Sequence, residues 1–212
     1  MRKMNKLGFL HLIVISTIAL LSFSSCNQKP QKLPIIGFEK EAANGEKVHH
    51  KIPPFQFVNQ DSFLVTNSKY SNKIYAADFF FTSCPSICPK VMKQMMRIAD
   101  SQADNEKFAL ISHTIDPKRD TPERLKVYAE NLEIDETKWD FLTGDEDELL
   151  DMADEYYVAA YKDPTAPGGF DHSGKILLVD TNGHIRAFCD GTDPDDVDDF
   201  IKDIDILMKE YE

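Results

Sequence analysis

The residues with the clearest chemical potential are Cys84 and Cys88, within the segment Phe79–Pro89. An apolar run over 73–81 predicts a buried strand before them, and the apolar spacing after Pro89 predicts a helix. Amide donors and the helix dipole stabilise anions at such a strand-to-helix turn, so we expect at least one thiol to have a lowered pKa. Three residues separate the cysteines, about one helical turn, which lets both sulfurs face a common point. This arrangement suits metal chelation at least as well as disulfide exchange.

Two thiolates leave a metal ion short of ligands, and His172 is the best candidate for a third. It lies in the loop-like stretch 168–174, just before a strand predicted over 175–180, where a side chain can be both held and exposed. Thiolates select Cu(I), zinc or iron–sulfur clusters, and imidazole suits copper and zinc, so copper and zinc form the short list. From the spacing alone, a surface histidine near a structural dithiol is an equally good interpretation.

Three segments in this order resemble the Sco/SenC family of copper-binding, thioredoxin-like proteins that serve cytochrome c oxidase assembly. They are residues 81–89, 112–123 and 171–173, and the resemblance extends from about residue 55 to residue 208. It implies an α/β, thioredoxin-like fold and a copper site in which Cys84, Cys88 and His172 hold Cu(I), with Cu(II) left open. Two positions depart from the family, because Ser86 stands where an acidic residue is common and His113 where an apolar one is.

Asp116, Asp120 and Asp171 are the residues that we expect to support the metal site from outside the ligand set. Asp116 and Asp120, with Arg119, form a tight charged turn at the carboxyl end of a predicted strand, the edge at which sites of open α/β sheets gather. A loop fixed by a salt bridge and a helix cap explains the same turn equally well.

Several other residues carry metal-binding or thiol groups but have simpler interpretations. They are Met92, Met95 and Met96 in the predicted helix, the loop pair His49 and His50, and Cys189 in the last predicted strand. We interpret the methionines as core packing, the histidine pair as solvated and Cys189 as a buried small residue. His113 could reach the dithiol only if its side chain leaves its strand on the same side as Cys84.

Residues 1–25 are typical of a signal peptide, and Cys26 after two serines resembles a bacterial lipoprotein processing site. The segment has basic residues at positions 2, 3 and 6, no acidic residue and an interrupted apolar stretch over 7–23. We expect cleavage before Cys26, lipidation of this cysteine, and a lipid-anchored protein of the cell envelope that faces the periplasm. An uncleaved membrane anchor is the alternative, although the apolar run is short for the ~20 residues of a spanning helix.

The charge of the chain argues against binding to nucleic acid. Removal of residues 1–25 takes away three of the 24 basic residues and none of the 36 acidic ones, so the net charge falls from −12 to −15. An acidic surface repels phosphate backbones and could instead steer a cationic partner, although a merely soluble surface is the simpler explanation.

The rest of the chain is typical of one domain behind a polar segment. We interpret residues 26–52 as a lipidated tether and 53–212 as the thioredoxin-like domain. An N-terminal hairpin is predicted over 55–66, and the later strands, at 73–81, 108–115, 139–142, 175–180 and 184–189, alternate with helices from about 89, 120, 145 and 195. This order predicts a central mixed sheet flanked by helices. Asp120 and Glu123 are expected to form a capping box.

Two functions of different classes follow. The resemblance implies a membrane-tethered copper chaperone that delivers copper to the copper-bearing subunit of a cytochrome c oxidase or to another copper-trafficking protein. The alternative is a thiol–disulfide oxidoreductase, in which Cys84 attacks a partner disulfide and Cys88 resolves it. A copper or redox sensor is a third interpretation. Of the three functions only the oxidoreductase is an enzyme, so enzymatic activity is left open.

Overall fold

The computed structural model describes residues 32–41 and 44–211, so the predicted signal peptide and Cys26 lie outside the described part. Its elements are, in chain order, β1 (Glu39–Glu41), β2 (Lys47–His49), β3 (Gln56–Asn59), β4 (Leu64–Thr66), the 3-10 helix η1 (Asn67–Tyr70), β5 (Ile74–Phe80), α2 (Cys88–Ser101), β6 (Phe108–Thr114), α3 (Pro122–Asn131), β7 (Trp139–Thr143), α4 (Glu146–Glu155), β8 (Ala160–Lys162), β9 (Phe170–His172), β10 (Lys175–Val179), β11 (Ile185–Asp190) and α5 (Pro194–Glu210).

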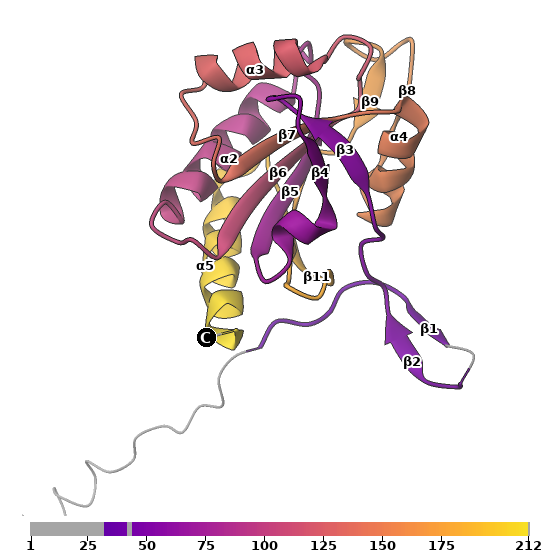
Figure 1. The fold of residues 1–212 in the computed structure, drawn as a ribbon, viewed down its shortest axis with the longest axis vertical. Helices are drawn as coiled ribbons and strands as arrows, with labels where there is room; N and C mark the ends of the chain where they lie inside the picture. Colours follow the sequence, from indigo (N-terminus) through magenta and orange to yellow (C-terminus); the bar gives the residue numbers. More distant parts are fainter. Residues whose placement is uncertain (1–31, 42–43, 212) are drawn as a thin grey trace, which may run out of the picture. The chain divides into compact units, whose positions relative to one another are not determined.

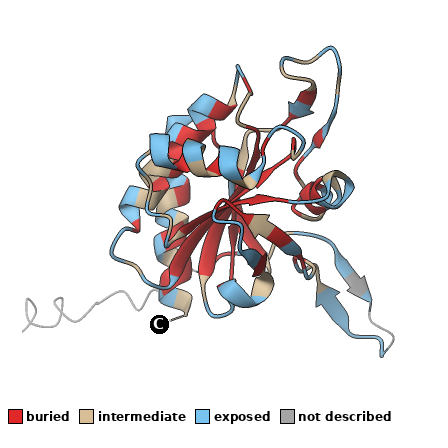
Figure 2. Ribbon diagram, turned by 45° about the horizontal axis from the view of Figure 1, so that its top comes forward, coloured by how far each residue is buried: buried red, intermediate tan, exposed pale blue. Residues whose placement is uncertain are grey.

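A seven-stranded mixed sheet in the order β11-β10-β5-β6-β7-β3-β4 forms the centre of the fold (Figure 1). Strands β5, β6 and β7 are parallel, and antiparallel strands flank them on both sides. Every residue of the three parallel strands is buried (Figure 2), as expected for parallel strands that are covered on both faces. The predicted mixed sheet flanked by helices is therefore confirmed, with the predicted hairpin as β3 and β4 at its edge.

Two neighbouring residues of β5 show that helices cover opposite faces of the sheet. Phe80 packs against Tyr128 of α3, whereas Phe79 packs against Tyr156 at the end of α4. Successive strand residues point to opposite faces, so α3 and α4 lie on opposite sides of the sheet (Figure 1). Within the described ranges, no helix has both the length and the apolar character that crossing a membrane requires.

Helix α2 begins immediately after β5 and buries one face against the core. Pro89 occupies its first turn, where a missing amide hydrogen costs nothing. Met92 and Met95 are buried on the inner face and Met96 is half-buried, which confirms core packing for the methionines. The start of α2 thus places Cys88 next to the turn that carries Cys84.

The predicted capping box is wrong. The N-cap of α3 is Thr121, whose hydroxyl accepts a hydrogen bond from the amide of Arg124 at 3.4 Å. Asp120 is fully buried instead and accepts hydrogen bonds from Thr82 and Thr114. The carboxylate is thus drawn into the interior by hydroxyl donors on two other segments, which a local cap pattern cannot reveal.

Part of the segment predicted as a tether contacts the folded domain. The amide of Leu33 donates to Glu210 at 2.7 Å, and Arg186 donates to the carbonyl oxygens of Leu33 and Pro34 at 2.6 and 3.1 Å. Ile36 pairs with Ile185 at the edge of β11. Residues 33–36 are therefore bound to the domain, because partners 152 to 177 residues away in the chain hold a stretch that has no structural pattern in its sequence.

Candidate metal centre

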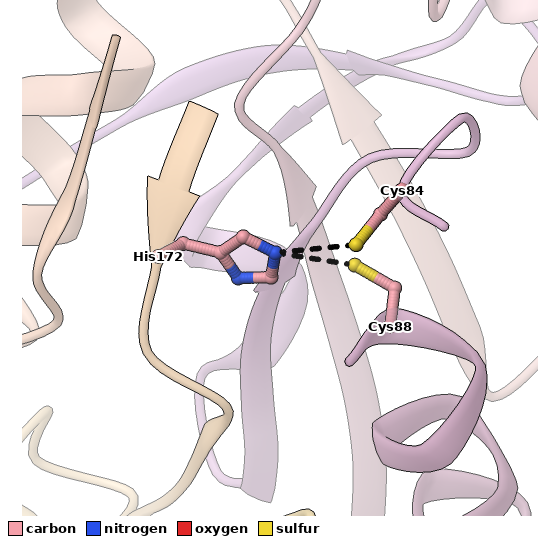
Figure 3. Close-up of side chains that lie close together, drawn as sticks. All are labelled: Cys84, Cys88 and His172. Carbon is pink, nitrogen blue, oxygen red and sulfur yellow. Dashed lines mark hydrogen bonds between the residues drawn. The ribbon is translucent and has the colours of Figure 1, made fainter. Parts of the chain in front are cut away.

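Three side chains from separate parts of the chain meet beyond the carboxyl end of β5 (Figure 3). Cys84 lies in the turn after β5, Cys88 is the first residue of α2, and His172 is the last residue of β9. The Nε2 atom of His172 is 3.7 Å from the sulfur of Cys84 and 3.3 Å from that of Cys88. All three ligand atoms lie within 4.8 Å of one another, so a single ion could contact them together.

His172 is held more firmly than the sequence suggests. It belongs to β9, which pairs with β8 so that His172 lies opposite Ala160, and the next amide, that of Ser173, donates to Ala159 at 2.9 Å. The residue is buried, with 9% of its surface exposed, rather than exposed in a loop. Strands of three residues are too short to show an alternating pattern, which explains the difference.

Phe81 joins the histidine segment to the cysteine segment. Its ring meets the ring of His172 edge-on, with centroids 5.5 Å apart, and lies 5.6 Å from that of Phe170. Gly168 passes so close that a Cβ atom there would lie 2.5 Å from Phe81, and its φ of +88° also favours glycine. The Gly168–Gly169 pair was the sequence signal for this close approach, but only the fold identifies Phe81 as its partner.

The two thiols differ in acidity. Burial disfavours the thiolate of Cys84, but hydrogen bonds from His172, Ser86 and the backbone amides of Ser86 and Cys88 outweigh burial and lower its pKa to about 6. This confirms the prediction of a thiol activated at a helix N-terminus. Burial raises the pKa of Cys88, and the nearby sulfur of Cys84 and the carboxylate of Asp78 raise it further. At neutral pH the site therefore holds one thiolate and one thiol.

A buried carboxyl group lies near the dithiol, a residue that the sequence reasoning missed. Asp78 of β5 is fully buried; it accepts a hydrogen bond from Ser112 at 2.5 Å, while its second oxygen has no partner among the described residues. Burial raises the pKa of Asp78 to about 7. An acidic residue inside an apolar strand is the only sequence signal for it.

The donor set fits a soft metal ion of low coordination number. Two sulfurs and one imidazole nitrogen, all buried, are ligands that suit Cu(I) or zinc. The other ring nitrogen of His172, Nδ1, has no hydrogen-bond partner among the described residues. The ring is therefore oriented by packing against Phe81 and by the β8–β9 pairing, rather than by the second hydrogen bond that metal-bound histidines usually make.

The three expected supporting residues have different contacts. Asp120 accepts a hydrogen bond from the amide of Thr82, two residues before Cys84, at 3.0 Å. Asp116 forms an ion pair with Arg119. Asp171 is exposed, and its carboxylate accepts a hydrogen bond from the hydroxyl of Tyr161 at 2.8 Å, on the other strand of the hairpin.

His113 and Cys189 lie apart from the ligand set. The ring of His113 is fully buried; it stacks on Phe79 at 4.9 Å and also contacts Phe55, Phe57 and Tyr156. Cys189 is buried in β11, as predicted, and burial raises its pKa.

The histidine pair predicted as solvated is only partly so. His49 and His50 are half-buried, and the His50 ring bonds to the carbonyl of Glu155 at 2.9 Å. The ring of His49 lies edge-on to that of His184, with centroids 6.2 Å apart.

Comparison with known proteins agrees with this geometry. Residues 43–209 match the SCO1/SenC family. A SCO1 protein homolog of Bacillus subtilis is 30% identical over 161 residues, which cover 75% of this chain and 83% of the relative. BsSco, described as a member of the Sco family of cytochrome c oxidase assembly proteins with a disulfide switch, is 28% identical with a TM-score of 0.67, over 84% of this chain and 98% of its own. Copper-bound ScoI of Bradyrhizobium japonicum is 28% identical with a TM-score of 0.57, over 76% and 98%. The fold is thus thioredoxin-like.

Proposed function

The chain belongs to the SCO1/SenC family, and we propose that it is a copper chaperone that binds Cu(I) through Cys84, Cys88 and His172. The observation that carries this proposal is the convergence of two sulfurs and one imidazole nitrogen within 4.8 Å, from three separate segments. The copper-bound state of one relative and the oxidase assembly role of another support copper as the cargo. The expected acceptor is the copper-bearing subunit of a cytochrome c oxidase, or another copper-trafficking protein.

The geometry also suits release of the ion by ligand exchange. The thiolate of Cys84 is available at neutral pH because its pKa is about 6. Three ligands leave room around a Cu(I) ion for an incoming ligand from a partner. Copper can therefore pass to the partner one ligand at a time without being released into water.

The test is an anaerobic titration of the reduced soluble form, residues 27–212, with Cu(I) against a competing chelator. We expect tight one-to-one binding, weakened at least tenfold in His172→Ala, about 1.4 kcal/mol or more. His49→Ala is the matched control, because His49 lies in β2 rather than at the centre, and it should bind as the wild type does. Weak binding, or equal affinity in the wild type and His172→Ala, would overturn the copper assignment.

The asymmetry of the two thiols supports a second candidate function, thiol–disulfide exchange. Cys84 has the lowered pKa of an attacking thiol, and Cys88 has the raised pKa of a buried resolving thiol. The His172→Ala variant separates the two functions, because it removes a metal ligand and keeps the dithiol. Exchange with a model disulfide should persist, although more slowly at neutral pH, because the Cys84 thiolate loses its hydrogen bond from His172. Loss of copper affinity with retained exchange favours the chaperone, whereas a wild type that exchanges disulfides but binds copper weakly favours the oxidoreductase.

We also propose that the protein is lipid-anchored at Cys26 in the cell envelope and faces the periplasm. The support is the pattern of residues 1–26, which lie outside the described part of the chain. Intact mass of the membrane-extracted protein should show loss of residues 1–25 and added acyl chains. Cys26→Ser should abolish the added mass, and an unmodified N-terminus in the wild type would refute the anchor.

A further inference from the structure

We infer that Arg119 is a positioning residue. It holds the His172 segment against the cysteine segment and so determines how much His172, the third ligand, contributes to Cu(I) affinity. This inference rests on the proposed copper site. The turn from Asp116 to Arg124 contacts both halves of the site, which no other part of the described chain does through side-chain hydrogen bonds.

The turn first fixes the cysteine half. Both carboxylate oxygens of Asp120 accept hydrogen bonds from Thr82, one from its amide at 3.0 Å and one from its hydroxyl. Arg124 donates to the same hydroxyl at 2.7 Å. Thr82 lies two residues before Cys84, so these contacts fix the start of the turn that carries the thiolate.

The turn then fixes the histidine half through a single side chain. The Nη2 atom of Arg119 donates to the carbonyl oxygen of Gly168 at 2.6 Å. Gly168 belongs to the connection between β8 and β9, which is closed at its base by the amide of Asp163 donating to Gly169 at 3.0 Å. The ring of Phe81 packs against Gly168 and against the ring of His172. The hydrogen bond from Arg119 to Gly168 therefore keeps the β8–β9 connection in contact with Phe81, the ring that orients His172.

Asp116 orients the guanidinium of Arg119 for its hydrogen bond to Gly168. Asp116, which is 3% exposed, forms an ion pair with it, while the side chain of Arg119 remains about half-exposed. Arginine suits this position because its planar group can meet a carboxylate on one edge and a carbonyl on the other. The ammonium of lysine is a point charge, so Arg119→Lys should preserve only part of the effect.

Loss of the contact should weaken the third ligand and spare the dithiol. Without Arg119, the β8–β9 connection keeps its internal hydrogen bonds but loses its hydrogen bond to the 116–124 turn. Cys84 and Cys88 keep their positions, because Asp120 and Arg124 still hold Thr82. The expected phenotype is thus reduced copper affinity in a protein whose dithiol still exchanges disulfides.

The test compares Arg119→Met with Arg119→Lys and with the control Lys118→Met. Lys118 is the adjacent, exposed residue of the same turn. It pairs with Glu146, which also pairs with Lys162 of β8, but not with Gly168, so it controls for loss of a cation from the turn. We expect Arg119→Met to lower Cu(I) affinity about tenfold, as for loss of one charge-assisted hydrogen bond, with partial recovery in Arg119→Lys. In the metal-free protein, Arg119→Met should also speed amide hydrogen exchange in residues 160–174 and leave residues 79–90 unchanged.

A second variant keeps the inference testable from the other end of the contact. Gly168→Ala places a Cβ atom against Phe81 and should displace the connection, with a loss of affinity that is not additive with Arg119→Met. Equal Cu(I) affinity and equal amide hydrogen exchange in Arg119→Met and Lys118→Met would overturn the inference. Additive losses of affinity in the double variant of Arg119→Met and Gly168→Ala would also overturn it. If the wild type fails to bind Cu(I), the proposed function fails, and the metal-free exchange measurement still decides the role of Arg119.

Discussion

At the scale of single residues, the site is built from unequal partners. Cys84 accepts hydrogen bonds from a helix N-terminus and from His172, whereas Cys88 is more deeply buried and lies near Asp78. Environment and not residue type decides which sulfur is the thiolate, since both are cysteines of one short motif. The sequence therefore predicts that at least one thiol has a lowered pKa. It names Cys84 as the attacking thiol only within the oxidoreductase alternative, and the burial of Cys88 supplies the physical reason for that choice.

The difference between the thiols predicts selective alkylation of the reduced, metal-free protein. Cys84 should react with iodoacetamide with a midpoint near pH 6, because its thiolate is stabilised, while Cys88 and Cys189 react slowly below pH 9. Peptide mapping across a pH series measures the three sites separately. His172→Ala should shift the Cys84 midpoint upward, since one hydrogen bond to the thiolate is lost; equal rates at Cys84 and Cys88 would contradict this assignment.

The buried, uncharged ring of His113 should make the protein less stable in acid. Burial lowers its pKa to about 3, and neither ring nitrogen has a hydrogen-bond partner among the described residues. The unfolded chain takes up a proton below about pH 6.5, and the folded protein takes it up only near pH 3. Stability is therefore fully present above pH 6.5 and is lost as the pH falls towards 3, by about 2 to 3 kcal/mol at pH 4.5.

Urea denaturation of the wild type and His113→Phe at pH 7 and pH 4.5 measures this contribution. The variant should lose about 2 to 3 kcal/mol less than the wild type between the two pH values. Asp78 acts in the opposite direction, because its raised pKa makes stability fall as the pH rises from 3.8 to about 7, but it is common to both proteins. Parallel losses in the two proteins would show that His113 is not the acid-sensitive group.

At the scale of elements, prediction succeeded where the apolar pattern was long or where turn residues clearly marked its end. The fully buried, mostly apolar β5 and the Asn182–Gly183 hairpin turn appear close to their predicted places. The strands β8 and β9 were missed, because three residues carry no period and their pairing is settled by packing against Phe81. The ligand His172 was thus identified from its place in a loop-like stretch and from the family resemblance, while the strand that carries it was not predicted.

The corrected start of α3 predicts that two neighbouring residues have separable roles. Thr121→Ala removes a helix cap and should cost about 1 kcal/mol of unfolding free energy without changing copper affinity. Asp120→Ala leaves the donors of the partly buried Thr82 and the buried Thr114 without their acceptor, so it should cost more stability and also weaken copper binding. Denaturation and Cu(I) titration of both variants measure this; reduced copper affinity in Thr121→Ala would contradict the separation.

At the scale of the whole folded unit, residues 33–36 and the metal centre lie at opposite ends of the sheet. Val179 of β10 pairs with Tyr75 near the start of β5, so Asp180 and Arg186 lie at the end away from Cys84. Arg186 there contacts two carboxylates and the carbonyl oxygens of Leu33 and Pro34. Residues 33–36 are therefore held at the end of the sheet away from the ligands.

Removal of the Arg186 contacts should lower stability and speed proteolysis but should not change copper binding. Arg186→Met leaves Asp180 buried beside Glu210 without a compensating cation, which should cost about 3 to 5 kcal/mol and release residues 33–36. Urea denaturation should show the loss, and limited proteolysis should cut the variant before residue 53 faster than the wild type. Arg97→Met, at the exposed pair with Asp198, is the control and should change stability by less than about 1 kcal/mol. Because the two ends of the sheet do not share ligands, a fall in Cu(I) affinity in Arg186→Met at a temperature where it remains folded would refute their independence.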